Sequence, residues 1–268
     1  MSASDLFKAG KLQDAINAQL PEVKANPTDH GKRLFLFELL GFAGDLDRAR
    51  RQIDAIQYDQ PELVAAVLSY KNLLDAEQER RRLFRDGVAP KFFGEAPEHV
   101  HWRLEALNRL REGRPQEAAQ CLEKAVESTP VIKGRLNDKP FASLRDCDDI
   151  FAGVLEVMAQ GGYYWVPLEQ IETLTLNAPR FPRDLLWAPG RLELADSGGN
   201  VFLPALYPGS HEHSDEAIKL GRATDWKETP GGPVQGVGGR TFLVDEDTLS
   251  VLEWRKLERE APEGSSVA

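Results

Sequence analysis

The first half of the chain repeats a glycine and a proline at one fixed separation, which constrains its fold more than any other feature. A proline follows each of three glycines after 17 residues, and an alanine stands five positions after each glycine: Gly10, Ala15 and Pro27; Gly44, Ala49 and Pro61; Gly113, Ala118 and Pro130. The second set begins 34 residues after the first, and the third begins 69 residues later, close to two further periods. Glycine suits a tight turn between two helices, and proline ends a helix.

This period is typical of the tetratricopeptide helix–turn–helix repeat, whose length is about 34 residues. The pattern predicts that residues 1–130 are almost wholly helical, in antiparallel pairs that turn at the three glycines. Apolar residues recur at helical spacing in the expected helices: 6–20 (broken at Gly10), 31–43, 45–56, 62–85, 99–111 and 115–128. Segment 62–85 lacks a turn glycine, and we interpret it as helices that fill a degenerate third repeat. We therefore predict a tetratricopeptide-like α-α superhelix over residues 1–135.

The net charge of the chain arises in its second half. Residues 1–140 contain 22 basic and 22 acidic side chains, whereas residues 141–268 contain 11 and 21, so the net charge of −10 lies after residue 140. An acidic surface argues against a nucleic-acid partner, because phosphate binding needs positive charge. The basic run Arg80–Arg82, followed by Arg85, is interpreted as a solvated helix face or as a docking surface for the acidic half, in preference to a phosphate-binding site.

Composition also bears on the cellular location. No stretch approaches the roughly 18 consecutive apolar residues of a membrane span, and the first residues lack the basic and apolar regions of a signal peptide. The two cysteines, Cys121 and Cys147, show no disulfide or metal-binding spacing. We therefore expect a cytoplasmic protein with no membrane association.

After Pro130 the pattern changes, and residues 136–260 are predicted to form a smaller, mostly antiparallel α+β domain. Segment 131–140 is expected to be a connector. Asp146, Asp148 and Asp149 precede an apolar run that we expect to be one leading helix, ended by Gly161 and Gly162. Short alternating segments predict a twisted sheet or small barrel from six strands: 163–166, 171–176, 191–194, 201–206, 240–244 and 251–257. Residues 261–268 are expected to be a disordered tail.

A search for catalytic patterns favours a protein without enzymatic activity, cofactor or bound metal. His211, His213 and nearby acids could ligate a metal, but a polar loop in which they are solvated explains them better. The glycine-rich stretch 231–240 lacks the Lys-Ser/Thr and the following helix of a phosphate-binding loop, so we expect a flexible loop or hairpin. The alternative that stays open is an enzyme or metal-binding protein with its site around His211, His213 and Asp225.

The second half carries phrases that resemble the ImpE family, also called SciE or TagJ, of type VI secretion accessory proteins. The phrases occur in order: RDCDD at 145–149, GYYWVP at 162–167, RDLLW at 183–187, LPALYPGS at 203–210, GRATDW at 221–226 and RTFLV at 240–244. The resemblance implies a cytoplasmic bacterial adaptor. Its implied partner is the N-terminal helix of the small contractile-sheath subunit, and it implies an association with the ATPase that dismantles the sheath. It supplies no catalytic residues.

A helical-repeat surface suits the capture of an amphipathic helix in an apolar groove. If the repeat register holds, five residues lie on the first helices of their pairs and line the concave face: Leu34, Glu38, Phe42, Arg103 and Leu107. Leu34, Phe42 and Leu107 could equally be core residues. The other candidate surface is the sheet face at residues 163–165, where aromatic side chains alternate between two sides of a strand.

Overall fold

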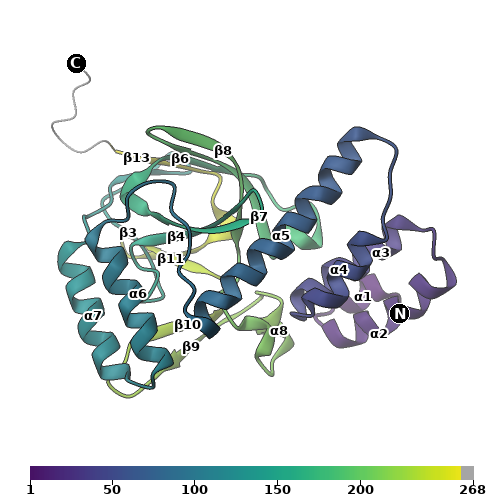
Figure 1. The fold of residues 1–268 in the computed structure, drawn as a ribbon, viewed down its shortest axis with the longest axis horizontal. Coiled ribbons are helices and arrows are strands. Elements are labelled where there is room, and N and C mark those ends of the chain that lie inside the picture. Colours follow the sequence, from purple (N-terminus) through teal and green to yellow (C-terminus); the bar gives the residue numbers. More distant parts are fainter. Residues whose placement is uncertain (261–268) are drawn as a thin grey trace.

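The computed structural model describes residues 1–260, which form a helical front half followed by antiparallel sheets (Figure 1). The predicted tail 261–268 lies outside the described residues. The front half holds α1 (Ala3–Lys8), α2 (Leu12–Ala25), α3 (His30–Phe42), α4 (Leu46–Asp54), α5 (Pro61–Asp86), α6 (Glu98–Arg111) and α7 (Pro115–Ser128). None of the helices within residues 1–260 is long and apolar enough to cross a membrane.

The glycine and alanine positions of the repeat have the conformations that the pattern predicts. Gly10, Gly44 and Gly113 have φ angles of +80°, +75° and +72°, and each lies in the turn between two helices. The alanines five positions later are fully buried between the paired helices: Ala15, Ala49 and Ala118. Glycine adopts a positive φ without the steric cost that a Cβ brings, so the sequence determines these turns directly.

The slot of the degenerate repeat holds one helix and not a pair. Helix α5 runs unbroken for 26 residues, Pro61–Asp86, because no glycine or proline interrupts it, and the left-handed Gly87 (φ 73°) caps its end. Helices α1 to α4 pack as one lobe, α5 crosses from that lobe to the sheets, and α6 and α7 lie beside the sheets (Figure 1). The third glycine–proline unit is therefore not stacked on the first two. The division at residue 135 stays a prediction.

The back half is built from two main sheets and a hairpin. Its strands are β1 (Gly134–Leu136), β2 (Lys139–Phe141), β3 (Leu144–Asp146), β4 (Val154–Ala159), β5 (Gly162–Pro167), β6 (Ile171–Leu176), β7 (Trp187–Leu194), β8 (Ser197–Pro204), β9 (Thr224–Glu228), β10 (Val234–Gly238), β11 (Thr241–Val244), β12 (Asp247–Ser250) and β13 (Lys256–Arg259). The larger sheet has the order β2-β1-β13-β6-β7-β8-β4-β5, the smaller one β12-β11-β3, and β9 pairs with β10. All strand pairs are antiparallel.

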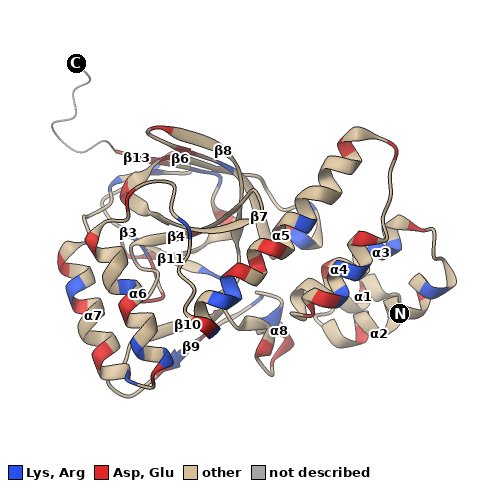
Figure 2. Ribbon diagram, viewed as in Figure 1, with Lys and Arg blue, Asp and Glu red and all other residues tan. Residues whose placement is uncertain are grey.

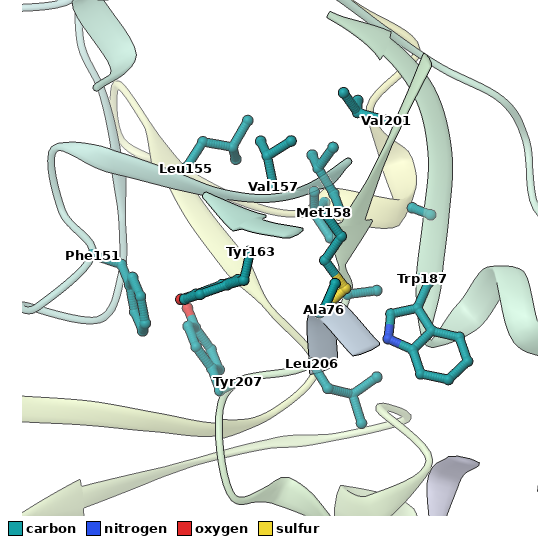
Figure 3. Packing of buried hydrophobic residues seen from close by; sticks show 14 of the residues in the cluster. Ala76, Phe151, Leu155, Val157, Met158, Tyr163, Trp187, Val201, Leu206 and Tyr207 are labelled. Carbon is teal, nitrogen blue, oxygen red and sulfur yellow. The ribbon is translucent and has the colours of Figure 1, made fainter. Parts of the chain in front are cut away.

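The structure corrects two expectations for the start of this half and confirms one. The supposed connector 131–140 contains β1 and most of β2, which pair with each other and, through β1, with β13. The supposed leading helix is strand β4, in which five consecutive residues from Val154 are buried (Figure 3). A strand covered on both faces reads as a continuous apolar run, which periodicity cannot distinguish from a buried helix segment. The glycine-rich stretch 231–240 forms part of the expected hairpin, as β10.

The turn of the first repeat, at Gly10, is held by the back half of the chain. Arg222 donates to the carbonyls of Phe7 (2.7 Å) and Lys8 (2.9 Å) at the end of α1. The carboxylate of Glu216, on α8 (Glu216–Lys219), accepts a bond of 2.7 Å from the Gln13 amide at the start of α2. The Gln13 amide lies in the first turn of α2, where helix amides have no intrahelical partner, and Arg222 adds bonds to carbonyls in the last turn of α1.

Candidate functional site

A cluster of buried charges lies where α5 meets the sheets; we call Arg80, Asp146, Glu156 and Arg240, with Tyr163 and Tyr207, the buried charge cluster. Arg80 of α5 donates to both carboxylate oxygens of Glu156 on β4, at 2.7 and 2.8 Å. Arg240 pairs with Glu156 and, at 3.1 Å, with Asp146. All four charged side chains are buried.

The two tyrosines complete the hydrogen bonding of this cluster. The Tyr163 hydroxyl donates to Glu156 and accepts from the Trp165 indole (2.6 Å). The Tyr207 hydroxyl lies 2.7 Å from Asp146. Figure 3 shows the two hydroxyls pointing toward each other. Burying a charge in the low-dielectric interior is costly unless it is paired and hydrogen-bonded, and nearly all of the charged groups in this cluster have such partners.

The carboxyl groups in and beside the cluster differ in pKa, because burial raises the pKa of each and nearby arginines lower it to different extents. Burial opposes ionisation of Glu156, but Arg80 and Arg240 outweigh it and hold the pKa of Glu156 below its usual value. Burial raises the pKa of Asp146 to about 6, against the pull of Arg240. Burial, with the neighbouring Asp146, raises the pKa of Asp148 to about 8. Asp148 accepts bonds from the Ile150 and Gly236 amides and has no arginine bonded to it.

A cleft of about 430 Å³ opens beside this cluster, between the C-terminal half of α5, the loop residues 208–212 and the β9–β10 hairpin. Its polar lining includes Arg81, Arg85, His211 and Lys227, and blue bands mark the arginines on this part of α5 in Figure 2. Burial lowers the pKa of His211, and Arg81 lowers it further. The basic charges here are largely used within the chain: Arg81 pairs with Glu77 and Arg80 with Glu156. The pair between Arg80 and Glu156 joins α5 to the acidic second half of the chain. For Arg80, the interpretation as a docking surface for that half therefore holds.

The residues of the alternative metal or enzyme site are only partly brought together. His213 lies 3.8 Å from Asp225, but His211 points the other way, toward the Gly44 turn and Arg81. Within residues 1–260, no group of three or more His, Cys, Asp or Glu side chains is arranged to hold a metal ion. Asp146 and Asp148 bond to arginine, tyrosine and backbone groups and do not cap a helix.

Four of the five residues expected on the concave face are buried by the chain itself, which corrects their assignment to an open surface. Phe42 and Leu107 are core residues, as the alternative interpretation held. Glu38 pairs with Arg183, and Arg103 donates to the Asp149 carbonyl at 2.8 Å. Leu34 is partly buried and packs on the core.

The chain's own segment 181–187 occupies the face of α3 on which a partner was expected. It includes the short 3₁₀ segment Pro182–Leu185. Trp187 packs on Phe37 of α3, with ring centroids 6.2 Å apart, and a side chain added at Gly41 would meet the Trp187 and Leu186 side chains. Sequence reasoning missed this segment because nothing local in it signals that it contacts α3.

Beside this segment runs an open depression, which we call the α5 groove. Its main part, about 590 Å³, lies between α5, where Ser69 and Tyr70 line it, and residues 177–189 with Phe202. A smaller depression of about 210 Å³ continues it along α5 to Ala76, sharing Ser69, Leu73 and Phe202. The exposed ring of Phe181 stands at its wall.

The opposite side of α5 carries exposed aliphatic side chains, which we call the α5 ridge. Val64 and Leu68 are 49% and 57% exposed. With Tyr58 and Val67, Val64 and Leu68 line a shallow depression of about 490 Å³. Several exposed apolar side chains on one element indicate a contact surface more strongly than single ones do.

The sheet face at residues 163–165 is largely covered. Tyr163 and Trp165 are buried, and Tyr164 stacks on Phe93 with ring centroids 4.3 Å apart. Backbone bonds of 3.0 Å join Lys91 to Tyr163 and Trp165 and cover this edge of the sheet. The face therefore offers less free apolar surface than α5.

The geometry defines a two-part protein, a helical-repeat lobe docked on an antiparallel domain, whose open features are surfaces and grooves. Comparisons with known proteins agree. Residues 138–258 match the family model described as "ImpE protein". The chain is 35% identical over 261 residues to the "Type VI secretion system accessory component TagJ" of Pseudomonas aeruginosa strain PAO1, covering 97% of this chain and 92% of that protein.

A solved structure shows the same architecture. The crystal structure of the protein VPA1032 from Vibrio parahaemolyticus superposes with a TM-score of 0.86 at 25% sequence identity, over 96% of this chain and 97% of that one. The chain belongs to the ImpE family, also called SciE or TagJ, as its sequence phrases predicted.

Proposed function

We propose that this protein is a non-enzymatic accessory component of a bacterial type VI secretion system. It acts in the cytoplasm as an adaptor that binds the N-terminal helix of the small contractile-sheath subunit. By holding that helix it assists the recycling of the sheath by the associated ATPase. The similarity to a type VI secretion accessory component along nearly the whole chain supports the system to which it belongs.

The observation that carries the binding role is the apolar surface of α5. The N-terminal half of this helix projects from the body of the molecule (Figure 1), with the α5 groove on one side and the α5 ridge on the other. An amphipathic helix that buries apolar residues at i, i+3, i+4 and i+7 against such a surface gains most of its affinity from that burial.

The test is calorimetric titration of the intact protein with a peptide containing the N-terminal helix of the small sheath subunit encoded with it. We expect a dissociation constant in the micromolar range, about −8 kcal/mol, because ordering the peptide offsets part of the apolar gain. A peptide of the same composition in scrambled order is the control. Equal, weak heats from both peptides would contradict the proposal.

A further inference from the structure

We infer that the partner helix lies in the α5 groove with a carboxylate facing Arg180, an assignment that rests on the proposed function and adds to it the surface and the chemistry of recognition. The groove follows α5 from Ala66 to Ala76. At a rise of about 1.5 Å per residue this is roughly 15 Å, the length of about three helical turns.

The walls of the groove carry the side chains that dominate binding energy in protein interfaces. Tyr70, Trp187 and Phe202 line it, together with the exposed Phe181. The Arg183 guanidinium stacks between the rings of Tyr70 (4.7 Å) and Phe181 (4.1 Å) and so joins its two walls. Aromatic residues and arginine are enriched at the centres of binding sites, where large surfaces become desolvated.

The charged side chains at the groove indicate which charge the partner helix carries. Arg183 bonds to Glu38 and stacks on two rings of the chain itself, so its guanidinium is already engaged within the chain. Arg180 is exposed and forms no ion pair within residues 1–260. In a protein of net charge −10, an unpaired arginine at the edge of an aromatic groove favours an acidic side chain on the partner.

The α5 ridge is the competing surface, and the groove fits a helix better. The ridge offers Val64 and Leu68 over a shallow depression lined by Lys71, which is already paired with Asp54. The groove is enclosed on two sides and combines apolar walls with an unpaired charge. A helix in the groove is held in register by both, whereas the ridge supplies only apolar contact.

The test compares variants of the intact protein in binding the sheath-subunit peptide. Phe181→Ala removes an apolar wall, and Arg180→Glu reverses the charge at the edge. The matched control for Phe181→Ala is Leu68→Ala on the ridge. The matched control for Arg180→Glu is Arg82→Glu, which changes an exposed arginine of α5 that has no ion pair in the described part of the chain. Far-UV circular dichroism and thermal unfolding verify that each variant is folded.

We expect each groove variant to weaken binding tenfold or more and each control to change it less than twofold. Peptides in which each acidic residue is replaced in turn by lysine should include one that binds Arg180→Glu better than it binds the original protein. If the wild-type peptide binds all groove variants normally and Leu68→Ala weakens it, the groove assignment is wrong although the proposed function stands. If the peptide does not bind the unaltered protein, the proposed function itself fails.

Discussion

At the scale of single residues, Glu156 is the group on which the contact between α5 and the sheets depends most. It is fully buried, yet two arginines from distant parts of the chain and a tyrosine hydroxyl all bond to it. Removal of one partner from a buried ion pair leaves an uncompensated charge in a low-dielectric interior. The same pairing makes α5 a fixed part of the sheet domain at its C-terminal half.

We predict that Glu156→Gln destabilises the protein by about 3–5 kcal/mol, because the buried Arg80 then keeps only the 3.6 Å contact with Glu77 and the buried Arg240 keeps only Asp146. Urea unfolding monitored by tryptophan fluorescence measures the change. Asp86→Asn, which breaks an ion pair at the surface with Arg85, is the control and should change stability little. Equal stability of the two variants would contradict a structural role for the cluster.

We predict that stability falls as pH rises from about 4 to about 8, with Asp148 as a main contributor. The folded protein raises the pKa of this carboxyl to about 8, mainly by burial, whereas the unfolded chain ionises it near 3.8. Unfolding between these values releases a proton, so each pH unit removes up to about 1.4 kcal/mol per such group. Urea midpoints from pH 5 to 8 measure the slope.

The matched variant for this test is Asp148→Asn, which cannot release a proton. Its stability should vary less with pH than that of the unaltered protein, and the difference should grow between pH 5 and 8. Asp146 and Glu38, whose pKa values rise to about 6 and about 7, retain part of the slope. Parallel pH profiles for the two proteins would show that Asp148 is ionised in the folded state.

At the scale of helices and strands, the glycine turns share a positive φ but differ in what packs against them. Gly44 and Gly113 have nearly the same positive φ. A side chain at Gly44 would lie 2.1 Å from the His211 ring, whereas one at Gly113 would meet nothing within 4 Å. The turn at Gly44 is therefore also a contact with the sheet domain.

We predict that Gly113→Ala costs about 1 kcal/mol, the strain of a positive φ alone. Gly44→Ala should cost distinctly more, because His211 must also move. Thermal unfolding by calorimetry compares the two directly. Combining Gly44→Ala with His211→Ala should bring the extra cost back down. Equal costs for the two glycine variants would contradict the close packing of His211 on the turn.

At the scale of the whole molecule, the repeat lobe is held to the sheet domain by polar contacts that lie far apart in the sequence. Arg222 and Glu216 satisfy the ends of α1 and α2, and Glu38 on α3 pairs with Arg183. Burial raises the pKa of Glu38 to about 7 in spite of Arg183. The lobe contact therefore includes an acid that is only partly ionised at neutral pH.

We predict that Arg183→Met loosens the lobe contact more at pH 8 than at pH 6. Without the arginine, the buried Glu38 is tolerated only in its neutral form, which the lower pH favours. Hydrogen exchange of the α3 amides, read by mass spectrometry, should become faster at pH 8 after correction for the intrinsic rate. The double variant with Glu38→Gln should lose this pH dependence. Unchanged protection in Arg183→Met would show that apolar packing alone holds the lobes.

The sequence by itself determined those features whose cause is local. The turns at Gly10, Gly44 and Gly113 need a residue without a Cβ, and the helices between them follow from apolar spacing, so both were predictable. The family membership was likewise readable from short phrases of the second half.

Only the tertiary structure decided what depends on coverage by distant segments. A continuous apolar run fits strand and helix equally; the run from Val154 is a strand because β5 and β8 pair with its two edges and α5 packs against it. The face of α3 around Glu38 is closed because residues 181–187 fold onto it, so the open groove lies along α5. Local spacing indicates which side of a helix is apolar; the rest of the chain determines what covers it.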